Sequence, residues 1–156
     1  MSAVGGRVDF REASPTDLPT ILALLADDPL AADRGGYART VDARTQAAFD
    51  EIDRDPNNRL LVGVQGGSVV AVLQLTLIPG LSLGGTKRAL VEAVRVRSDL
   101  RGLGVGAALM QHAILMARQA GCGLMQLTTD KRRTRARDFY ARLGFVASHE
   151  GMKLAL

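Results

Sequence analysis

The sequence predicts a single α/β domain, in which a mixed β-sheet carries helices on both faces. Apolar residues follow strand and helix periods in the order β-α-α-β-β-β-α-β-α-β-β. A hairpin in the middle of the chain requires antiparallel strands, whereas a later β-α-β unit requires a parallel pair. At 156 residues the chain suits one domain, 1–156, with a core of its own.

The first third of the chain predicts one strand followed by two helices. Residues 8–13, "VDFREA", alternate apolar and polar side chains as a half-buried strand does. Ser14 is the expected N-cap of the first helix, and Asp17 stands where a capping carboxylate belongs. This helix ends near Pro29, and a second apolar helical pattern covers 41–52.

The middle of the chain predicts three strands. Residues 59–65 and 68–78 flank Gly66-Gly67, a pair of residues typical of a two-residue hairpin turn. A third strand is predicted at 87–96, "KRALVEAVRV". Apolar residues occupy both the odd and the even positions of these strands, which indicates a sheet covered on both faces.

The last third of the chain predicts two helices and three strands. Residues 104–120 predict a helix, and 124–129, "LMQLTT", predict a buried strand after it. A shorter helix is expected at 134–143. Two closing strands are expected at 145–150 and 152–156.

Composition narrows the class of protein. The net charge is +4 and the isoelectric point about 9.8, which favours anionic partners. The single cysteine, Cys122, excludes an internal disulfide framework and a multi-cysteine metal site, and no metal is expected. The N-terminus lacks an apolar signal core, and Pro79 with several glycines interrupts the uncharged residues 63–86. We therefore expect a cytoplasmic protein without a membrane span.

A dense basic run invites comparison with nucleic-acid-binding modules. Five cationic side chains lie within seven residues: Lys131, Arg132, Arg133, Arg135 and Arg137. No aromatic residue interleaves them, and Asp138 follows on the same predicted helix. A solvated helix face is the simpler interpretation, so nucleic-acid binding stays a minor alternative.

A glycine turn opens the helix at 104–120. In "VEAVRVRSDLRGLGVG", residues 91–106, Arg101, Gly104 and Gly106 stand where a strand leads into that helix. The first N–H groups of a helix lack intrahelical partners, and glycines let a ligand approach them closely. The turn therefore suits a pyrophosphate.

Two other nucleotide-binding patterns fit less well. No GxxxxGK[ST] string of a P-loop occurs. Residues 102–107, "GLGVGA", satisfy the dinucleotide pattern GxGxxG/A, and Asp130 could serve as the ribose-binding acid. That fold, however, places its glycine turn directly after its first strand, whereas here "RSDL" intervenes and an antiparallel hairpin precedes.

Residues 90–106 closely resemble motif A of the Gcn5-related N-acetyltransferase (GNAT) superfamily. Arg101, Gly104 and Gly106 match its (Arg/Gln)-x-x-Gly-x-(Gly/Ala) turn, and 135–145, "RARDFYARLGF", resemble a later motif of the same superfamily. The resemblance implies a mostly antiparallel central sheet with helices on both faces and a splayed pair of parallel strands.

The resemblance also implies acetyl-CoA as co-substrate. Its pantetheine arm would hydrogen-bond to the backbone of Val94 and Val96, much as an added strand would. The 3′-phosphate would meet some part of the basic run 131–137. The pyrophosphate would rest on the amides of six consecutive residues: Arg101, Gly102, Leu103, Gly104, Val105 and Gly106.

Two residues are candidate catalytic groups for acetyl transfer to a primary amine. Glu92, on the same predicted strand face as Val94, would be the base, directly or through water, since a buried carboxylate needs a partner or a purpose. The alternative is an ion pair with Arg88, Arg95 or Arg97. Tyr140 would be the acid that protonates the thiolate, and a core tyrosine is its alternative. Val94 N–H would be the oxyanion donor.

One position departs from the superfamily pattern. Many relatives carry Asn near the start of the tyrosine-bearing helix, where this chain has Thr134, which can cap the helix and still bind the cofactor. His112 is expected at the surface, and His149 and Cys122 are not expected to be catalytic.

The acceptor is not readable from the sequence. In relatives the connection between the first two helices shapes the acceptor pocket, which here means 31–42, with Tyr37 as its aromatic residue and Gly35-Gly36 as a lid hinge. A small amine, a peptide N-terminus, the lysine side chain of a protein and an antibiotic amine all remain open as acceptors, as does a homodimer. A catalytically silent acyl-CoA-binding or regulatory domain is the main alternative.

Overall fold

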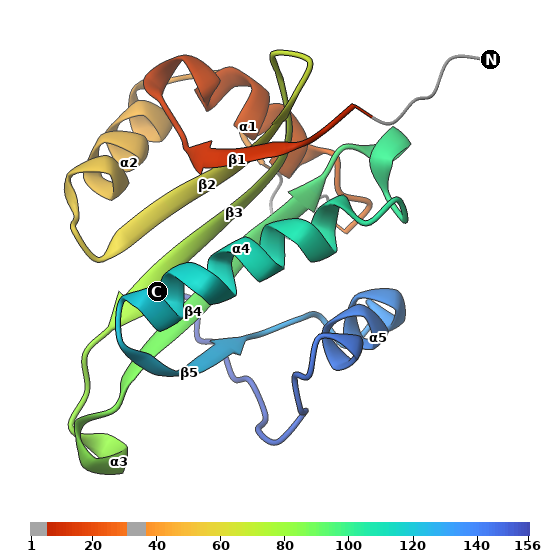
Figure 1. The fold of residues 1–156 in the computed structure, drawn as a ribbon. Helices are drawn as coiled ribbons and strands as arrows, with labels where there is room; N and C mark the ends of the chain where they lie inside the picture. Colours follow the sequence, from red (N-terminus) through yellow and green to blue (C-terminus); the bar gives the residue numbers. More distant parts are fainter. Residues whose placement is uncertain (1–5, 31–36) are drawn as a thin grey trace.

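The computed structural model describes residues 6–30 and 37–156 (Figure 1). One five-stranded sheet runs in the order β1-β2-β3-β4-β5. Its strands are β1 Asp9–Glu12, β2 Asn58–Gln65, β3 Ser68–Ile78, β4 Lys87–Val96 and β5 Cys122–Leu127. The helices are α1 Leu18–Ala26, α2 Ala43–Arg54, the short α3 Ser82–Gly85, α4 Val105–Gln119 and α5 Thr134–Arg142. Within the described residues, 3-10 turns cover Pro15–Asp17 and Ser98–Leu100.

The sheet is mixed, as the sequence predicts. β1 to β4 pair antiparallel, and β4 pairs parallel with β5. The parallel register runs from Lys87↔Cys122 to Val91↔Leu127 and stops there, whereas β4 continues to Val96. The two strands therefore form a fork that opens beyond Val91.

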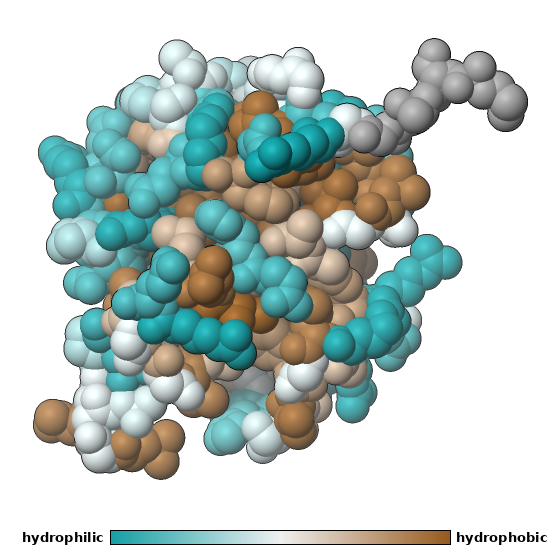
Figure 2. Space-filling view, viewed as in Figure 1, coloured by the Kyte–Doolittle hydropathy of each residue, from teal (hydrophilic) through white to brown (hydrophobic). Residues whose placement is uncertain are grey.

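Helices cover both faces of the sheet, which explains why the strands are apolar at both parities (Figure 1). On one face α4 buries Leu109 and Met110 completely, in a cluster that also holds Leu73 of β3. On the other face Ile21 and Leu24 of α1 pack on Val62 and Val72. We call these the α4 face and the α1/α2 face. α2 buries Phe49, and Figure 2 shows the surface around this helix, at the upper left, as mostly hydrophilic.

The first helix begins as its sequence predicts. The Asp17 carboxylate accepts hydrogen bonds from the backbone N–H of Ser14 at 2.7 Å and from its hydroxyl at 3.0 Å. The Arg11 guanidinium donates to the same carboxylate at 2.6 and 3.0 Å. The capping carboxylate thus also ties β1 to the start of α1.

A β-bulge interrupts β4 where the fork opens, and the alternation of apolar residues in the sequence does not predict it. The register with β3 jumps from Gln74↔Glu92 to Val72↔Arg95, so Ala93 and Val94 together face one residue, Leu73. Ala93 has a φ of +56°, in the left-handed region that residues with a side chain seldom adopt.

The bulge changes which side chains share a face. Glu92 and Arg95 lie opposite Gln74 and Val72 on the α1/α2 face, whereas Val94 packs with the cluster on the α4 face. The expectation that Glu92 and Val94 share a face is therefore wrong, because a bulge reverses the alternation of side chains.

The two closing strands expected at 145–150 and 152–156 are absent, and this expectation is wrong. After α5 the chain has no strand, and apolar side chains of this segment are exposed, 81% for Val146 and 94% for Met152. Alternating polarity alone does not stabilise a strand; its apolar side chains must also be buried against a neighbour. Within the described ranges, no helix is long and apolar enough to cross a membrane.

Candidate active site

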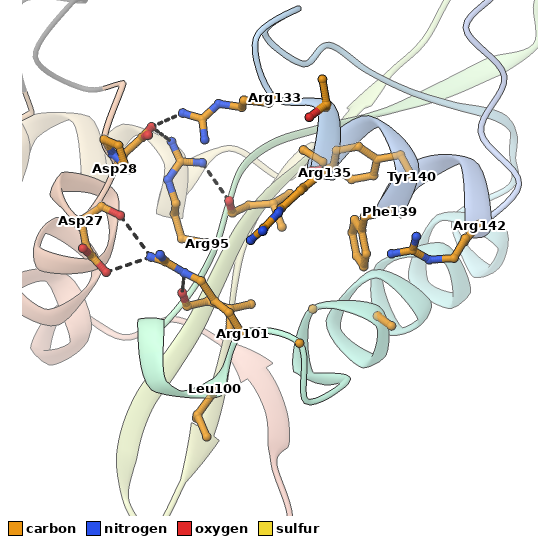
Figure 3. Close-up of a pocket in the computed structure, with 18 of the residues that line it drawn as sticks. Asp27, Asp28, Arg95, Leu100, Arg101, Arg133, Arg135, Phe139, Tyr140 and Arg142 are labelled. Atoms are coloured by element: carbon orange, nitrogen blue, oxygen red, sulfur yellow. Dashed lines mark hydrogen bonds and ion pairs between the residues drawn. The ribbon is translucent and has the colours of Figure 1, made fainter.

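A cleft of about 690 Å³ lies at the open end of the β4–β5 fork (Figure 3). Its walls come from β4, from the turn that opens α4, from α5 with the loop before it, and from the end of α1. Six arginines and two aspartates line it, so its lining is strongly cationic. These are Arg95, Arg101, Arg132, Arg133, Arg135 and Arg142, with Asp27 and Asp28.

β4 brings two of the predicted cofactor-binding residues, Val94 and Val96, to the wall of the cleft. The carbonyl of Val94 accepts a hydrogen bond from Arg95 Nη1 at 2.8 Å. The carbonyl of Val96 accepts one from Arg101 Nε at 3.0 Å. Arginine side chains thus hold the backbone of β4 along the stretch that has no β5 partner.

The glycine turn lies at the start of α4, as the sequence predicts. Gly104 is the N-cap of α4, with a φ of +88° that glycine adopts without strain. Arg101, Gly102, Gly104 and Gly106 line the cleft. The side chains of Leu103 and Val105 do not: Leu103 is exposed, and Val105 packs in the core.

Arg101 reaches back to the end of α1. Its Nη2 donates to the carboxylate of Asp27 at 2.8 Å and to the backbone carbonyl of Asp27 at 3.2 Å. Because its Nε bonds Val96, this guanidinium joins β4, the glycine turn and α1. The predicted phosphate donor therefore has a fixed place at the edge of the cleft.

Tyr140 lies on the α5 wall of the cleft. Its ring packs edge-on against Phe139 and Phe145, with centroids 5.1 and 5.8 Å away. Burial raises the pKa of the phenol, and the positive charges of Arg95 and Arg133 act against that rise without cancelling it. The phenol is therefore protonated at neutral pH.

Thr134 lines the cleft at the first residue of α5, as predicted for a cofactor contact. It does not cap the helix: the N-cap is Arg133, and no side-chain hydrogen bond closes that end. That part of the expectation is wrong.

Glu92 lies elsewhere than expected. Its side chain is exposed, and it is outside the lining of the cleft, so the prediction of a buried carboxylate is wrong. Arg95 pairs with Asp28, and Arg97 pairs with Asp99 at 2.6 Å. Glu92 is nevertheless the first β4 residue after the parallel pairing ends, at the apex of the fork.

Asp28, a buried carboxylate of the cleft, is not among the site residues predicted from the sequence. Arg95 Nη2 donates to it at 2.8 Å, Arg133 donates to the same oxygen, and the N–H of Leu30 donates to its other oxygen at 3.0 Å. Burial raises the pKa of Asp28, but these hydrogen bonds and the two positive charges outweigh burial, and the net pKa is lowered.

A signal for this cluster was present in the sequence. Asp27 and Asp28 follow α1, where the negative end of the helix dipole disfavours carboxylates. Two adjacent aspartates at that place need cationic partners from elsewhere in the fold. The basic run supplies one of them, Arg133, while Lys131 pairs at the surface with Glu150 at 3.8 Å.

The remaining candidates lie outside the cleft lining. Tyr37 is half-buried, and residues 31–36 of the expected acceptor loop lie outside the described residues. His112 is half-buried, with its ring 5.5 Å from that of Phe10, rather than at the surface. His149 bonds Ser148 at 2.8 Å. In the part of the chain that the structure describes, no group of three or more histidine, cysteine, aspartate or glutamate residues is placed to hold a metal ion.

Comparison with known proteins identifies the family. The family model described as "Acetyltransferase (GNAT) family" matches residues 21–145. A Salmonella typhimurium protein named aminoalkylphosphonate N-acetyltransferase is 34% identical over 95 residues, which span 61% of this chain and 61% of that protein.

Solved structures that are similar to this chain over nearly its whole length include the following two. One, described as a transcriptional regulator from Bacillus halodurans C-125, is 44% identical with a TM-score of 0.91, covering 96% of this chain and 100% of that one. The other, a Trypanosoma brucei acetyltransferase, is 25% identical with a TM-score of 0.79 over the same shares. The chain belongs to the acetyltransferase (GNAT) family.

Proposed function

We propose that this protein transfers the acetyl group of acetyl-CoA to a primary amine. The observation that carries the proposal is the fork between β4 and β5, which opens directly onto the glycine turn of α4 and forms one cationic cleft with it. A long, flexible thioester with a charged phosphate end suits such a cleft, which has a fork at one end and a helix N-terminus at the other.

The cleft residues fit the parts of acetyl-CoA. Val94 and Val96 would hydrogen-bond the pantetheine arm through their backbone. The amides of residues 101–106, with the guanidinium of Arg101, would hold the pyrophosphate. Arg135 and Arg142 line the same cleft and supply further positive charge for the 3′-phosphate.

Transfer would proceed by direct attack of the amine on the thioester carbonyl carbon. Glu92, exposed at the apex of the fork, would take the amine proton through a water molecule, and Val94 N–H would stabilise the oxyanion. The C–S bond then breaks, and the phenol of Tyr140 protonates the leaving thiolate. The products are an N-acetylated amine and the free thiol of CoA.

A second function has one observation in its favour. The Bacillus halodurans chain of 44% identity is described as a transcriptional regulator. A domain that keeps the fold and binds acyl-CoA without turnover would share this cleft. Release of CoA thiol in the presence of an amine distinguishes the enzyme from the silent binder.

The first test is a calorimetric titration of the purified protein with acetyl-CoA, with NADH as a control ligand. We expect binding at about micromolar strength, and none of NADH. Replacement of Gly104 by Val should abolish it. Gly121→Val is the matched control, since both glycines have positive φ and open space at Cβ, at opposite ends of α4. Failure of the natural protein to bind acetyl-CoA would overturn the proposal.

A further inference from the structure

Three charged side chains form a group in the cleft that we call the two-arginine cluster: Asp28, Arg95 and Arg133 (Figure 3). They come from the end of α1, from β4 and from the loop before α5. One carboxylate oxygen of Asp28 accepts from both guanidiniums. The side chains are 1%, 18% and 26% exposed, respectively.

The cluster holds one more positive charge than negative charge, because one carboxylate faces two guanidiniums. Among the described residues, the Nε of Arg95 is buried and has no hydrogen-bond acceptor. Buried donors in folded proteins nearly always have an acceptor, and an uncompensated charge away from water is costly. A further anionic group in the cleft would compensate the excess positive charge of the cluster.

The cluster reaches the cleft from the α1/α2 face. Arg95 stands opposite Val72 in the register, and Val72 packs against α1. The side chains of Val94 and Val96 instead pack on the α4 face, which also carries the helix opened by the glycine turn. Asp28 and Arg95 therefore stand on the α1/α2 face, whereas the helix that the glycine turn opens lies on the α4 face.

The cluster also adjoins the proposed chemistry. Arg95 Nη1 holds the Val94 carbonyl, in the residue whose N–H is the proposed oxyanion donor. The charges of both arginines also act on the phenol of Tyr140, the proposed acid. Glu92, the proposed base, lies on the same face of the sheet as Arg95.

We propose that the two-arginine cluster binds an anionic group of the acceptor, so that the substrate is a primary amine that also carries a phosphonate, phosphate or carboxylate. The inference rests on the proposed acetyl transfer. It assigns the phosphates of acetyl-CoA to the glycine turn and α5, and the charge of the acceptor to Arg95 and Arg133.

The sign of the charge separates classes of amine. A simple amine enters as an ammonium ion, and the net positive charge of the two-arginine cluster repels it. An anionic group on the same molecule reverses this interaction at the cluster. A diamine, with two positive charges, should be the poorest acceptor.

The test compares four amines that differ in the group at the far end of a short chain: aminoethylphosphonate, β-alanine, propylamine and ethylenediamine. Release of CoA thiol gives kcat and KM for each. Binding of each amine to the protein saturated with CoA is measured by calorimetry. We expect the phosphonate and the carboxylate to exceed propylamine by about tenfold or more in kcat/KM and in affinity.

Arg133→Gln makes the cluster neutral and should remove this preference. Affinity for aminoethylphosphonate should fall about tenfold, while affinities for propylamine and acetyl-CoA should change less than about twofold. Arg118→Gln removes one positive charge from an exposed side chain in the last turn of α4. It should leave the affinities for aminoethylphosphonate, propylamine and acetyl-CoA unchanged. Arg95→Gln serves as a second variant if Arg133→Gln does not fold.

Two results would overturn the inference: equal affinity of the CoA complex for aminoethylphosphonate and propylamine, or an Arg133→Gln defect confined to acetyl-CoA. The second would mean that the cluster serves the cofactor. Failure of acetyl transfer has a separate signature, since no amine would then release CoA thiol. The calorimetric comparison of amines still decides the inference in that case.

Discussion

The carboxylate of Asp28 lies 2.8 Å from the Nη2 of Arg95, although 67 residues separate them in the chain. This contact joins the end of α1 to the unpaired part of β4. Because Arg133 binds the same oxygen from the loop before α5, one buried carboxylate links three walls of the cleft.

Asp28→Asn should destabilise the protein by about 3 kcal/mol, because two mostly buried guanidiniums would lose their counter-charge. Urea unfolding of the variant measures the loss. Asp27→Asn is the matched control, since the Asp27–Arg101 pair is about half exposed and should contribute less than about 1 kcal/mol. Equal losses in the two variants would contradict this account.

The Arg11–Asp17 contact should make stability depend on pH in the acidic range. The hydrogen bond from Arg11 is the main cause that lowers the pKa of Asp17 from 3.8 to about 2. A carboxylate whose pKa is lower in the folded than in the unfolded state stabilises the fold at every pH above its unfolded pKa. This stabilisation is lost as pH falls from about 4 to about 2.

The contribution is about 1 to 2 kcal/mol, because the Arg11 side chain is 46% exposed and solvent screens the pair. Unfolding free energies of the natural protein and Asp17→Asn, measured between about pH 2 and 5, should converge at the acid end. A constant difference over that range would show that the ionised carboxylate is not responsible.

Ala93→Gly should stabilise the protein by about 1 kcal/mol, because the φ of +56° strains any residue with a side chain. Ala93→Val should destabilise it by at least as much, since a β-branched residue adopts this conformation least readily. Thermal unfolding measures both. Ala107→Gly, in α4, is the control and should be destabilising, as glycine is in a helix. Destabilisation by Ala93→Gly would contradict the strained bulge.

Tyr140→Phe should lower kcat by about a hundredfold and leave the affinity for acetyl-CoA nearly unchanged, because the variant keeps the ring and loses only the hydroxyl that we propose as the proton donor. Because burial raises the pKa of Tyr140, the phenol of the natural protein keeps its proton at neutral pH, and its ionisation should not lower kcat there. Steady-state kinetics and calorimetry on both proteins test this. An unchanged kcat would leave Tyr140 as a core tyrosine.

Glu92→Gln should lower kcat relative to the natural protein at neutral pH. The loss of kcat should be smaller at high pH, because more of the amine is already deprotonated there. A pH profile of kcat/KM for the variant measures this rescue. Asp99→Asn, whose carboxylate pairs with Arg97 outside the cleft lining, is the control and should keep the natural profile. Equal loss at every pH would argue against a general base.

Local features of the sequence predicted much of the fold. The paired glycines at 66–67 lie between antiparallel β2 and β3. Ser14 and Asp17 predicted the start of the first helix, and the β-α-β unit predicted the parallel pair. Each of these signals is local, because turns, caps and periodicity depend on residues a few positions apart.

The same locality explains why the glycine turn was found and Glu92 was misplaced. The need for glycine at 104 arises from its own φ, so it can be read from the sequence. Whether Glu92 is buried depends on which face it occupies. The alternation of apolar residues does not reveal the bulge at Ala93. Because of this bulge, Val94 points to the opposite face of the sheet from Glu92.

The mixed sheet, the glycine turn and the place of Tyr140 on a short helix after the parallel strand all follow from the sequence. The meeting of Asp28 with Arg95 and Arg133, 67 and 105 residues away, is visible only in the folded chain. The tertiary structure also decided that residues 145–156 form no strand. Turns and helix starts are set by neighbouring residues, whereas ion pairs and sheet edges depend on which distant segments the folded chain brings together.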